Sequence, residues 1–272
     1  MSASPPIIAA TAITKTFSTR SGTVEALGPV DLTVEPGEFV SIVGPSGCGK
    51  STLVSILSGL VRPSSGEVKV MGEPVTKPLT NLGIVFQEDL LLPWRNVLKN
   101  VLLQAEIRRL PMDEYERRAR RLLELVGLAG FESKLPGELS GGMRQRVAMC
   151  RALVHDPPLL LMDEPFGALD AMTRDQMNLD LEALASSTRK TTVFVTHSIA
   201  EAVFLSDRVV VMSPRPGRIQ AVIDIDFPRP RRLSLRDSVE YSTHITHIRR
   251  LFQSMGLFQE RGAQGAGAVA AL

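Results

Sequence analysis

Residues 39–57 read FVSIVGPSGCGKSTLVSIL, and this stretch decides how the rest of the chain is interpreted. Positions 39–43 are mostly apolar and β-branched, which is typical of a buried strand. The apolar positions after the glycines have helical spacing and predict a helix that begins near Lys50: Leu53, Ile56, Leu57 and Leu60. The residues between, 44–51, match the pattern G-x-x-x-x-G-K-[ST]. A strand, a glycine loop and a helix in this order predict a phosphate-binding loop rather than a plain tight turn.

The chemistry of this loop assigns a role to its main residues. Glycines let successive backbone N–H groups converge on a phosphate, and the helix N-terminus adds partial positive charge. Lys50 is expected to reach the β- and γ-phosphates of a nucleotide, and Ser51 to offer its hydroxyl to Mg²⁺. Cys48 holds a variable position, so its side chain is interpreted as packing and not as a nucleophile. The residues expected to bind nucleotide here are Gly44, Pro45, Ser46, Gly47, Cys48, Gly49, Lys50, Ser51 and Thr52.

Two adjacent carboxylates follow a second apolar run. Residues 159–162 are Leu-Leu-Leu-Met, and Asp163 and Glu164 come directly after them. Such residues lie at the carboxyl edge of an open α/β sheet, where ligands bind. Asp163 is expected near Mg²⁺, and Glu164 is placed to polarise a water aimed at the γ-phosphate. Alone, the pair could be two solvated acids that end a strand, but the phosphate loop favours the nucleotide role.

The order of the predicted elements indicates the fold class. Apolar strands alternate with helices between residues 159 and 212, which predicts a parallel sheet covered on both faces. Short β-branched runs between 7 and 43 predict strands, and the Leu-, Arg- and Glu-rich stretch 88–156 predicts an inserted helical subdomain. Within this stretch, Asp113 and Glu116 resemble a capping box that opens a helix stopped by Gly127. The expected apolar face of that helix is Ala119, Leu122, Leu123 and Val126.

The C-terminal part changes in composition. Residues 228–232 are rich in Pro and Arg and are interpreted as a solvated linker, with contact to anionic lipid or a regulatory role as alternatives. His244 and His247 are interpreted as part of an amphipathic helix rather than as metal ligands, because no third ligand has matching spacing. We expect a main domain at 7–228, a helical extension at 229–261 and a flexible tail at 262–272.

Composition excludes several classes of protein. The chain has 272 residues and 44% apolar content, enough for an ordinary core, and a formal net charge of +2 that argues against a nucleic-acid partner. Two cysteines cannot make a disulfide framework, which indicates a cytosolic redox context. No run of 18 apolar residues occurs and the N-terminus lacks the pattern of a signal peptide, so the chain itself is not expected to span a membrane.

A second glycine motif appears at residues 139–146, LSGGMRQR. Ser140 is a natural N-cap for the helix that follows, and Gly141 and Gly142 expose a second helix N-terminus that could hold an anion. One chain has little use for two such sites unless a second copy supplies the phosphate. The stretch resembles the signature motif LSGGQ of the ATP-binding subunits of ABC transporters, with Met143 in place of the usual Gln.

Further motifs of that family occur in the family's order, and the resemblance covers about residues 7–258. It implies that Gln87 contacts Mg²⁺ and the attacking water, that Asp170 lies in the loop that crosses to the partner copy, and that His197 contacts the γ-phosphate. It also implies that Phe17 stacks on adenine. Considered without the family, a lone His or Phe near a strand is more often part of the core.

Three stretches are similar to the ATPase subunits of nitrate, sulfonate and taurine importers: 87–97, Thr173 with Arg174, and 213–218. That resemblance implies a peripheral protein at the cytoplasmic face of a bacterial inner membrane. Two copies would lie under two permease subunits, which a periplasmic solute-binding protein supplies. Trp94, the only tryptophan, would be an anchor in the groove that receives the permease, or else a core residue of the helical subdomain.

The sequence therefore predicts a P-loop NTPase with a RecA-like parallel sheet, an N-terminal antiparallel β subdomain and an inserted α-helical subdomain. Its expected activity is ATP hydrolysis that powers import of a small, anionic solute. A soluble ABC-type ATPase of DNA repair or translation is disfavoured, because it would carry a coiled-coil insertion or a second nucleotide domain. An exporter subunit is disfavoured as well, because it is often fused to membrane helices. An adaptor without turnover is disfavoured by Glu164 and His197. The solute itself stays open among sulfonate, taurine, nitrate and pyrimidine-like compounds.

Overall fold

A six-stranded sheet forms the centre of the protein, which the computed structural model describes at residues 5–20, 22–167 and 169–257. Its spatial order is β10 (Ile219–Asp224), β9 (Arg208–Met212), β3 (Phe39–Val43), β8 (Thr191–Thr196), β7 (Leu159–Asp163) and β6 (Gly83–Val85). All neighbours pair in parallel except β10, which runs antiparallel to β9 at one edge. The predicted parallel sheet is confirmed, and β10 is an addition that the sequence analysis missed.

The register of this sheet gathers the predicted site at one edge. Val43 of β3 pairs with Thr196 of β8, and Asp163 of β7 pairs with Val195. Because parallel strands share their direction, the segments that follow β3, β7 and β8 leave the sheet at the same edge. The chain continues from β3 through the glycine loop into helix α1 (Lys50–Leu57), as predicted.

Helix α1 is shorter than the apolar spacing predicted. It ends at Leu57, and Gly59 then adopts a left-handed φ of 78°. A Cβ on Gly59 would lie 2.2 Å from the Lys77 carbonyl oxygen, so the turn depends on glycine. The prediction that Leu60 belongs to the buried face is wrong, because this residue follows the turn and is half exposed.

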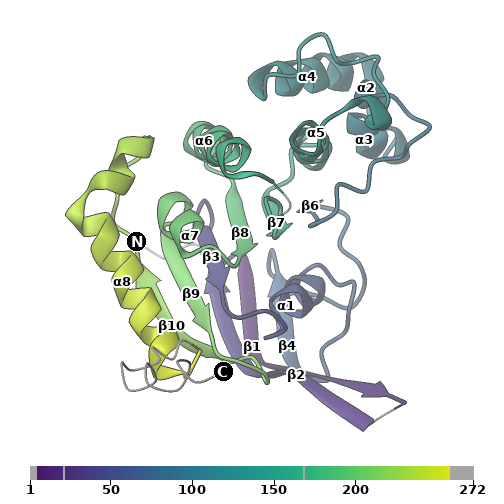
Figure 1. Cartoon of the computed structure of the whole chain (residues 1–272). Helices are drawn as coiled ribbons and strands as arrows, with labels where there is room; N and C mark the ends of the chain where they lie inside the picture. The colour runs from purple at the N-terminus through teal and green to yellow at the C-terminus, as the bar shows by residue number, and fades with distance from the viewer. Residues whose placement is uncertain (1–4, 21, 168, 258–272) are drawn as a thin grey trace, which may run out of the picture.

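A second, antiparallel sheet covers one face of the large sheet together with α1 (Figure 1). Its strands, in spatial order, are β2 (Gly22–Val34), β1 (Ile8–Thr19), β4 (Ser65–Val70) and β5 (Glu73–Pro74). Its buried side chains pack with those of α1 and with inward residues of β3, β7 and β8 into one apolar cluster. The predicted N-terminal antiparallel part is therefore present, although β4 and β5 follow α1 in the chain.

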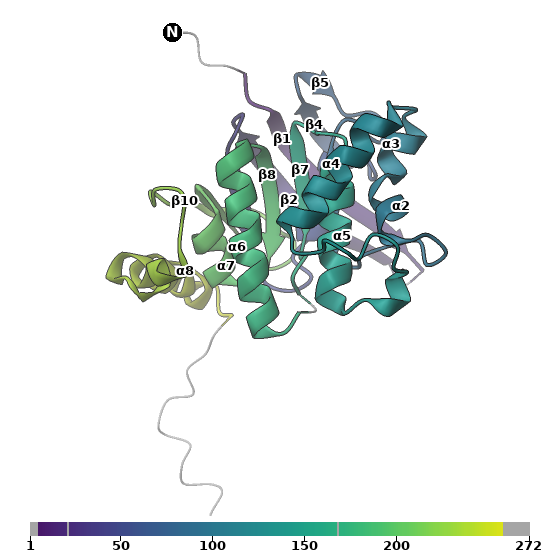
Figure 2. The same cartoon turned by 90° about the horizontal axis from the view of Figure 1, so that it is seen from above.

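Short helices occupy the stretch expected to be helical, and they lie together at one end of the molecule (Figures 1 and 2). They are α2 (Val97–Val101), α3 (Leu103–Ile107), α4 (Met112–Leu125), the 3₁₀ turn η1 (Pro136–Glu138) and α5 (Gly141–Leu153). The capping box predicted at Asp113 and Glu116 is wrong. Helix α4 begins at Met112, with Pro111 as its N-cap two residues before the predicted one, and the Pro111 carbonyl accepts hydrogen bonds from the Glu114 and Tyr115 N–H groups.

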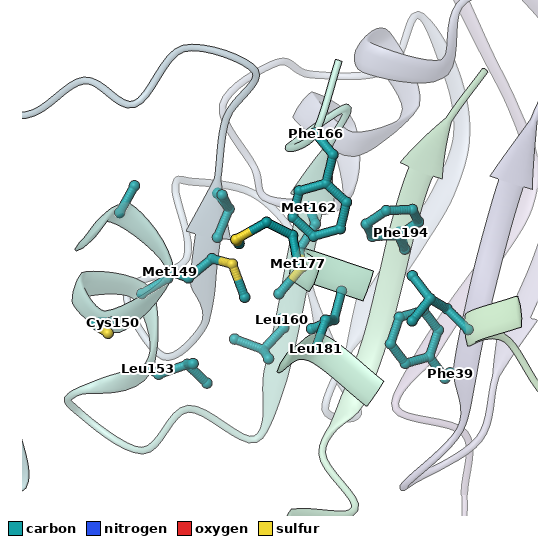
Figure 3. Packing of buried hydrophobic residues seen from close by; sticks show 14 of the residues in the cluster. Phe39, Met149, Cys150, Leu153, Leu160, Met162, Phe166, Met177, Leu181 and Phe194 are labelled. Carbon is teal, nitrogen blue, oxygen red and sulfur yellow. The ribbon is translucent and has the colours of Figure 1, made fainter. Parts of the chain in front are cut away.

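The opposite face of the large sheet is covered by α6 (Ala171–Thr188), α7 (Ile199–Leu205) and α5, as Figure 2 shows. Figure 3 shows the aromatic and sulfur-containing side chains that fill this layer. The Phe194 ring lies 5.6 Å from the Phe166 ring and 6.0 Å from the Phe39 ring, within the range of favourable aromatic pairs. This packing fixes the segments after β7 and β8 against the helices.

The Pro- and Arg-rich stretch 228–232 is not a solvated linker, which corrects the sequence interpretation. The Arg231 side chain is 1% exposed. Its Nη1 donates hydrogen bonds to the carbonyls of Phe204 (3.0 Å) and Ser206 (2.8 Å), and its Nη2 donates to the carbonyl of Phe227 (3.0 Å). The guanidinium therefore satisfies backbone carbonyls where α7 ends, and burial lowers its pKa to about 10.

Beyond this stretch, the 3₁₀ turn η2 (Leu233–Asp237) leads into α8 (Val239–Ser254), which packs against α7. The hydroxyl of Tyr241 donates a hydrogen bond of 2.7 Å to the Ala200 carbonyl. The predicted tail at 262–272 lies outside the described residues. No helix in the described ranges has the length and apolar content to cross a membrane.

Candidate functional site

Glycines give the loop between β3 and α1 a shape that other residues would not allow. Gly47 and Gly49 have φ values of 74° and 105°, a region that side chains disfavour. A Cβ on Gly49 would also lie 2.6 Å from a methyl carbon of Leu27 and 2.7 Å from the Ala26 carbonyl oxygen. The loop therefore wraps closely against β2 and turns directly into the N-terminus of α1.

Lys50 is the first residue of α1, and its side chain turns back over the loop. Its ammonium donates hydrogen bonds to the carbonyls of Gly44 (3.0 Å) and Pro45 (3.2 Å) and lies 3.5 Å from Glu164 Oε1. The side chain is only 4% exposed. A buried ammonium held beside the glycine loop and a carboxylate is an arrangement that can bind an anionic group.

Ser51 and Asp163 meet across the space between α1 and β7. The Ser51 hydroxyl donates a hydrogen bond of 3.0 Å to Asp163 Oδ1. Burial raises the pKa of Asp163 and the Glu164 carboxylate raises it further, while the hydrogen bond from Ser51 and the positive charge of Lys50 oppose this shift. A hydroxyl and a carboxylate at one point are the hard oxygen ligands that Mg²⁺ takes alongside nucleotide phosphates, so these residues fit that ion.

Glu164 has a strained backbone at the end of β7. Its φ is 46°, in the left-handed region, which costs about 1–3 kcal/mol for a residue with a side chain. Its N–H donates to the Val195 carbonyl and its own carbonyl accepts from the Gly167 N–H, so the surroundings fix this conformation. The result is a carboxylate with Oε1 near Lys50 and Oε2 3.2 Å from His197 Nδ1.

Lys50, Ser51 and Glu164 line a cavity of about 450 Å³ that also receives Phe17, Gln87 and Arg215. Asp163 and His197 are not part of this lining and adjoin it through their contacts with Ser51 and Glu164. Phe17 comes from β1 and is 38% exposed, so the alternative that it is a core residue is excluded. Gln87 follows β6 and enters from the side of the helical segment. The cavity lining comes from six separate parts of the chain, of which two were not predicted: Arg215, and Val24 with Ala26 on β2.

Arg215 is a residue of this cavity that the sequence analysis did not assign to a site. Its Nε donates a hydrogen bond of 3.1 Å to the Gly47 carbonyl. The neighbouring Gly217 lies so close to the glycine loop that a Cβ there would be 1.9 Å from the Cys48 carbonyl oxygen. The sequence links the stretch 213–218 only to importer ATPases by resemblance, and its glycine is the signal that could have indicated a close backbone contact.

The signature residues lie in a second group. Ser140 caps α5 by accepting a hydrogen bond from the Met143 N–H, as predicted, and Gly141 lines a different cavity of about 460 Å³ with Gln87. Gly142 packs against Thr173, where a Cβ would approach the Thr173 methyl to 2.6 Å.

Asp170 adjoins the same group through Thr173. It caps α6 with hydrogen bonds from the Thr173 N–H (3.0 Å) and hydroxyl (2.6 Å), and the bond from the hydroxyl lowers the pKa of Asp170. Among the described residues, none of the signature residues or Asp170 lines the Lys50 cavity, which Gln87 alone connects to the second cavity.

A family model for ABC transporters matches residues 27–167, just over half of the chain. The chain belongs to the ABC transporter family. It is 46% identical over 236 residues to an uncharacterized ABC transporter ATP-binding protein of Methanocaldococcus jannaschii, covering 87% of this chain and 88% of that protein. It is thus an ABC-type ATPase, and its parallel sheet with a phosphate loop is the P-loop NTPase fold.

Two named relatives belong to importers. The chain is 42% identical over 248 residues to the aliphatic sulfonates import ATP-binding protein SsuB of Bacillus cereus, covering 91% of this chain and 96% of SsuB. It is 48% identical over 213 residues to the taurine import ATP-binding protein TauB of Burkholderia pseudomallei, covering 78% and 82%. A solved dimeric ATP-binding cassette with ADP and phosphate, in a post-hydrolysis state, superposes with a TM-score of 0.73 at 32% identity, covering 81% of this chain and all of that one.

In this ABC ATPase, helix α5 holds the segment that follows Gln87. Arg144 Nε donates a hydrogen bond of 2.8 Å to Asp89 Oδ2, and Arg151 donates bonds of 2.7 Å to the carbonyls of Asp89 and Leu90. The segment that follows Gln87 is therefore bonded to α5, whose N-cap is Ser140. A few residues further on, Trp94 is 75% exposed, which excludes the alternative that it fills the core.

Proposed function

We propose that this chain is the ATP-hydrolysing subunit of an importer for a small anionic solute, acting as a head-to-tail dimer beneath membrane permease subunits. The observation that carries the proposal is the place of Glu164, which lines the same cavity as Lys50 and Ser51 and contacts both Lys50 and His197, beside the Ser51–Asp163 pair. The likeness to SsuB and TauB supports a sulfonate or taurine type of solute and a position at the cytoplasmic face of the inner membrane.

In this proposal the glycine loop, Lys50 and Thr52 hold the phosphates of ATP. Ser51, Asp163 and Gln87 hold Mg²⁺, which when bound neutralises charge on the phosphates. Phe17 stacks on adenine, and Arg215 adds positive charge beside Gly47. Among the described residues Arg215 forms no ion pair with a carboxylate, so its charge is available to a phosphate.

Glu164 serves as the group that orients and deprotonates the attacking water. Its Oε2 is next to His197, which is half exposed and can contact the γ-phosphate side of the cavity. The backbone strain at Glu164 supports this role, because strained conformations gather where a side chain must be aimed.

The separation of the two groups of site residues supports the dimer. Ser140, Gly141, Gly142 and Asp170 do not line the Lys50 cavity of their own chain. The first three form the capped N-terminus of α5, which is suited to a phosphate, and Asp170 caps the neighbouring α6. A second copy in the reverse orientation would bring this surface over the nucleotide. The dimeric form of the similar cassette is consistent with that arrangement.

The function is tested by co-expressing the chain with the permease encoded beside it and the matching solute-binding protein. In vesicles, we expect uptake of a sulfonate, taurine or nitrate only when MgATP is present on the side of this subunit. Hydrolysis by the purified chain without uptake of any of these anions would contradict the choice of solute and leave the ATPase assignment intact.

Replacing Phe17 by Ala should raise the KM for ATP about 10-fold and leave kcat within twofold, since stacking on a base contributes about 1–3 kcal/mol. Phe17→Tyr or Phe17→Trp should keep the wild-type KM, because both retain an aromatic face. Steady-state ATPase assays at several ATP concentrations measure the effect. An unchanged KM in Phe17→Ala would remove Phe17 from the nucleotide site.

Replacing Trp94 by Ala should weaken binding to the permease and lower transport at least 5-fold, with the melting temperature and basal ATPase unchanged. The reason is its position: an exposed aromatic residue a few positions after Gln87 is the kind of side chain that anchors interfaces. Co-purification, vesicle transport and thermal unfolding are measured together. Val239→Ala, which removes an equally exposed apolar side chain from α8, is the matched control. Full transport by Trp94→Ala would exclude it from the coupling surface.

A further inference from the structure

Glu201 is a buried carboxylate that the proposed mechanism does not yet use. It lies in the first turn of α7 and is 5% exposed. Its Oε2 accepts a hydrogen bond of 2.5 Å from the Thr196 hydroxyl, and its N–H donates to the Ser198 hydroxyl. The Ser198 N–H in turn donates to the Thr196 hydroxyl oxygen. Glu201 therefore holds the residues on both sides of His197.

The other oxygen of Glu201 faces α6. Glu201 Oε1 lies 3.5 Å from Nε of Arg174. At its far end, the Arg174 guanidinium donates a hydrogen bond of 2.9 Å to the Leu169 carbonyl, and the Arg174 N–H donates to the Asp170 carbonyl. The Arg174 side chain thus connects the loop that ends at Asp170 with the Glu201 carboxylate, which holds the segment around His197.

The Arg174 guanidinium and the Glu201 carboxylate lie at ion-pair distance but do not form a hydrogen bond. The buried Nε of Arg174 makes no hydrogen bond in the described part of the chain, and Glu201 Oε1 is its carboxylate neighbour at ion-pair distance. Burial raises the pKa of Glu201, so the carboxylate needs its polar partners to stay charged. A small shift of the Asp170 loop would shorten this contact into a charge-assisted hydrogen bond, which is stronger.

We propose that Glu201 and Arg174 are positioning residues that link the Asp170 loop to His197. When a second copy presses on the Asp170 loop, Arg174 moves toward Glu201, and Glu201 moves the segment that carries His197 with respect to Glu164. Hydrolysis then depends on dimer closure through this ion pair. The inference rests on the proposed function, because it requires the nucleotide-sandwich dimer.

The test compares Glu201→Gln, Arg174→Gln and the double variant with the wild-type enzyme. Gln at 201 keeps the shape and an acceptor for Thr196 but removes the charge that Arg174 faces. We expect kcat to fall about 10-fold in each single variant, with KM for ATP within twofold. The double variant should be no slower than the slower single variant, because both act through one contact. Glu38→Gln, which breaks a partly buried ion pair with Arg208 at the opposite end of β3, should leave kcat unchanged.

Each variant is also placed in a Glu164→Gln background, where ATP-driven dimer formation is measured by light scattering. Dimers should still form, because the link acts after closure. A kcat within twofold of the wild type in Glu201→Gln would overturn the inference. The inference would also be overturned if the fall in kcat came together with a weaker affinity for ATP and a lower melting temperature, because that combination indicates a structural role only. If the Glu164→Gln enzyme that carries neither the Glu201 nor the Arg174 substitution forms no dimers with ATP, the proposed function itself is overturned.

Discussion

Replacing Glu164 by Gln should lower ATP turnover about 10²–10⁴-fold while MgATP still binds, because removal of one positioned proton acceptor has an effect of that size. Gln keeps the shape of the side chain and its place between Lys50 and His197, which lie 3.5 Å and 3.2 Å from the two carboxylate oxygens. It cannot accept the proton of the attacking water. Single-turnover hydrolysis and nucleotide binding, measured separately, check both halves of this expectation.

The same variant should accumulate as an ATP-bound dimer, since closure would no longer be followed by hydrolysis. Size-exclusion chromatography with ATP, and with ADP as a control, measures the shift. Asp156→Asn is a matched carboxylate control, because Asp156 pairs with Arg118 and Lys190 on the surface and lies outside the nucleotide cavity. Wild-type turnover in Glu164→Gln would exclude this residue as the base.

Replacing Arg231 by Ala should lower the free energy of unfolding by about 3 kcal/mol, roughly a hundredfold in the unfolding equilibrium. The change leaves the Phe204 and Ser206 carbonyls buried without their donor and removes a partner of Asp207. Urea denaturation followed by circular dichroism measures the effect. Arg232→Ala is the matched control, since Arg232 is exposed and should cost less than 0.5 kcal/mol, about the limit for surface changes. Equal stability of both variants would restore the view of this stretch as a linker.

The phosphate loop, the acidic pair and the signature motif could be predicted because their chemistry is local in the sequence. A strand, a glycine loop and a helix in order fix where Lys50 and Ser51 must lie, and the rule for parallel sheets places Glu164 and His197 at the same edge. Such features need no knowledge of distant contacts. Phe17 and Trp94 each had two interpretations, and their exposure excludes the core interpretation for both, while their roles at adenine and at the permease stay predictions.

Two of the errors came from contacts made far away in the chain. Two of the carbonyls that Arg231 binds lie more than twenty positions earlier, so the composition of the stretch suggested a linker although its tertiary setting buries Arg231. Arg215 was missed for the same reason, since its partner Gly47 is 168 positions away. The capping box at Asp113 failed for a local reason, because Pro111, two residues earlier, is the N-cap of the helix.

The burial of Cys150 makes its thiol a built-in probe for the separation of the helices that cover it. Cys150 lies on α5, and its fully buried thiol lines an apolar cavity of about 300 Å³ with residues of α4 and α6. Burial raises the pKa of this thiol to about 12. A thiol reagent must therefore wait until these helices separate before the reactive thiolate can form. The rate at which Cys150 is alkylated, measured by mass spectrometry, would report the rate at which these helices separate, without any introduced label. A slower rate with bound ATP would show that nucleotide binding closes this part of the protein.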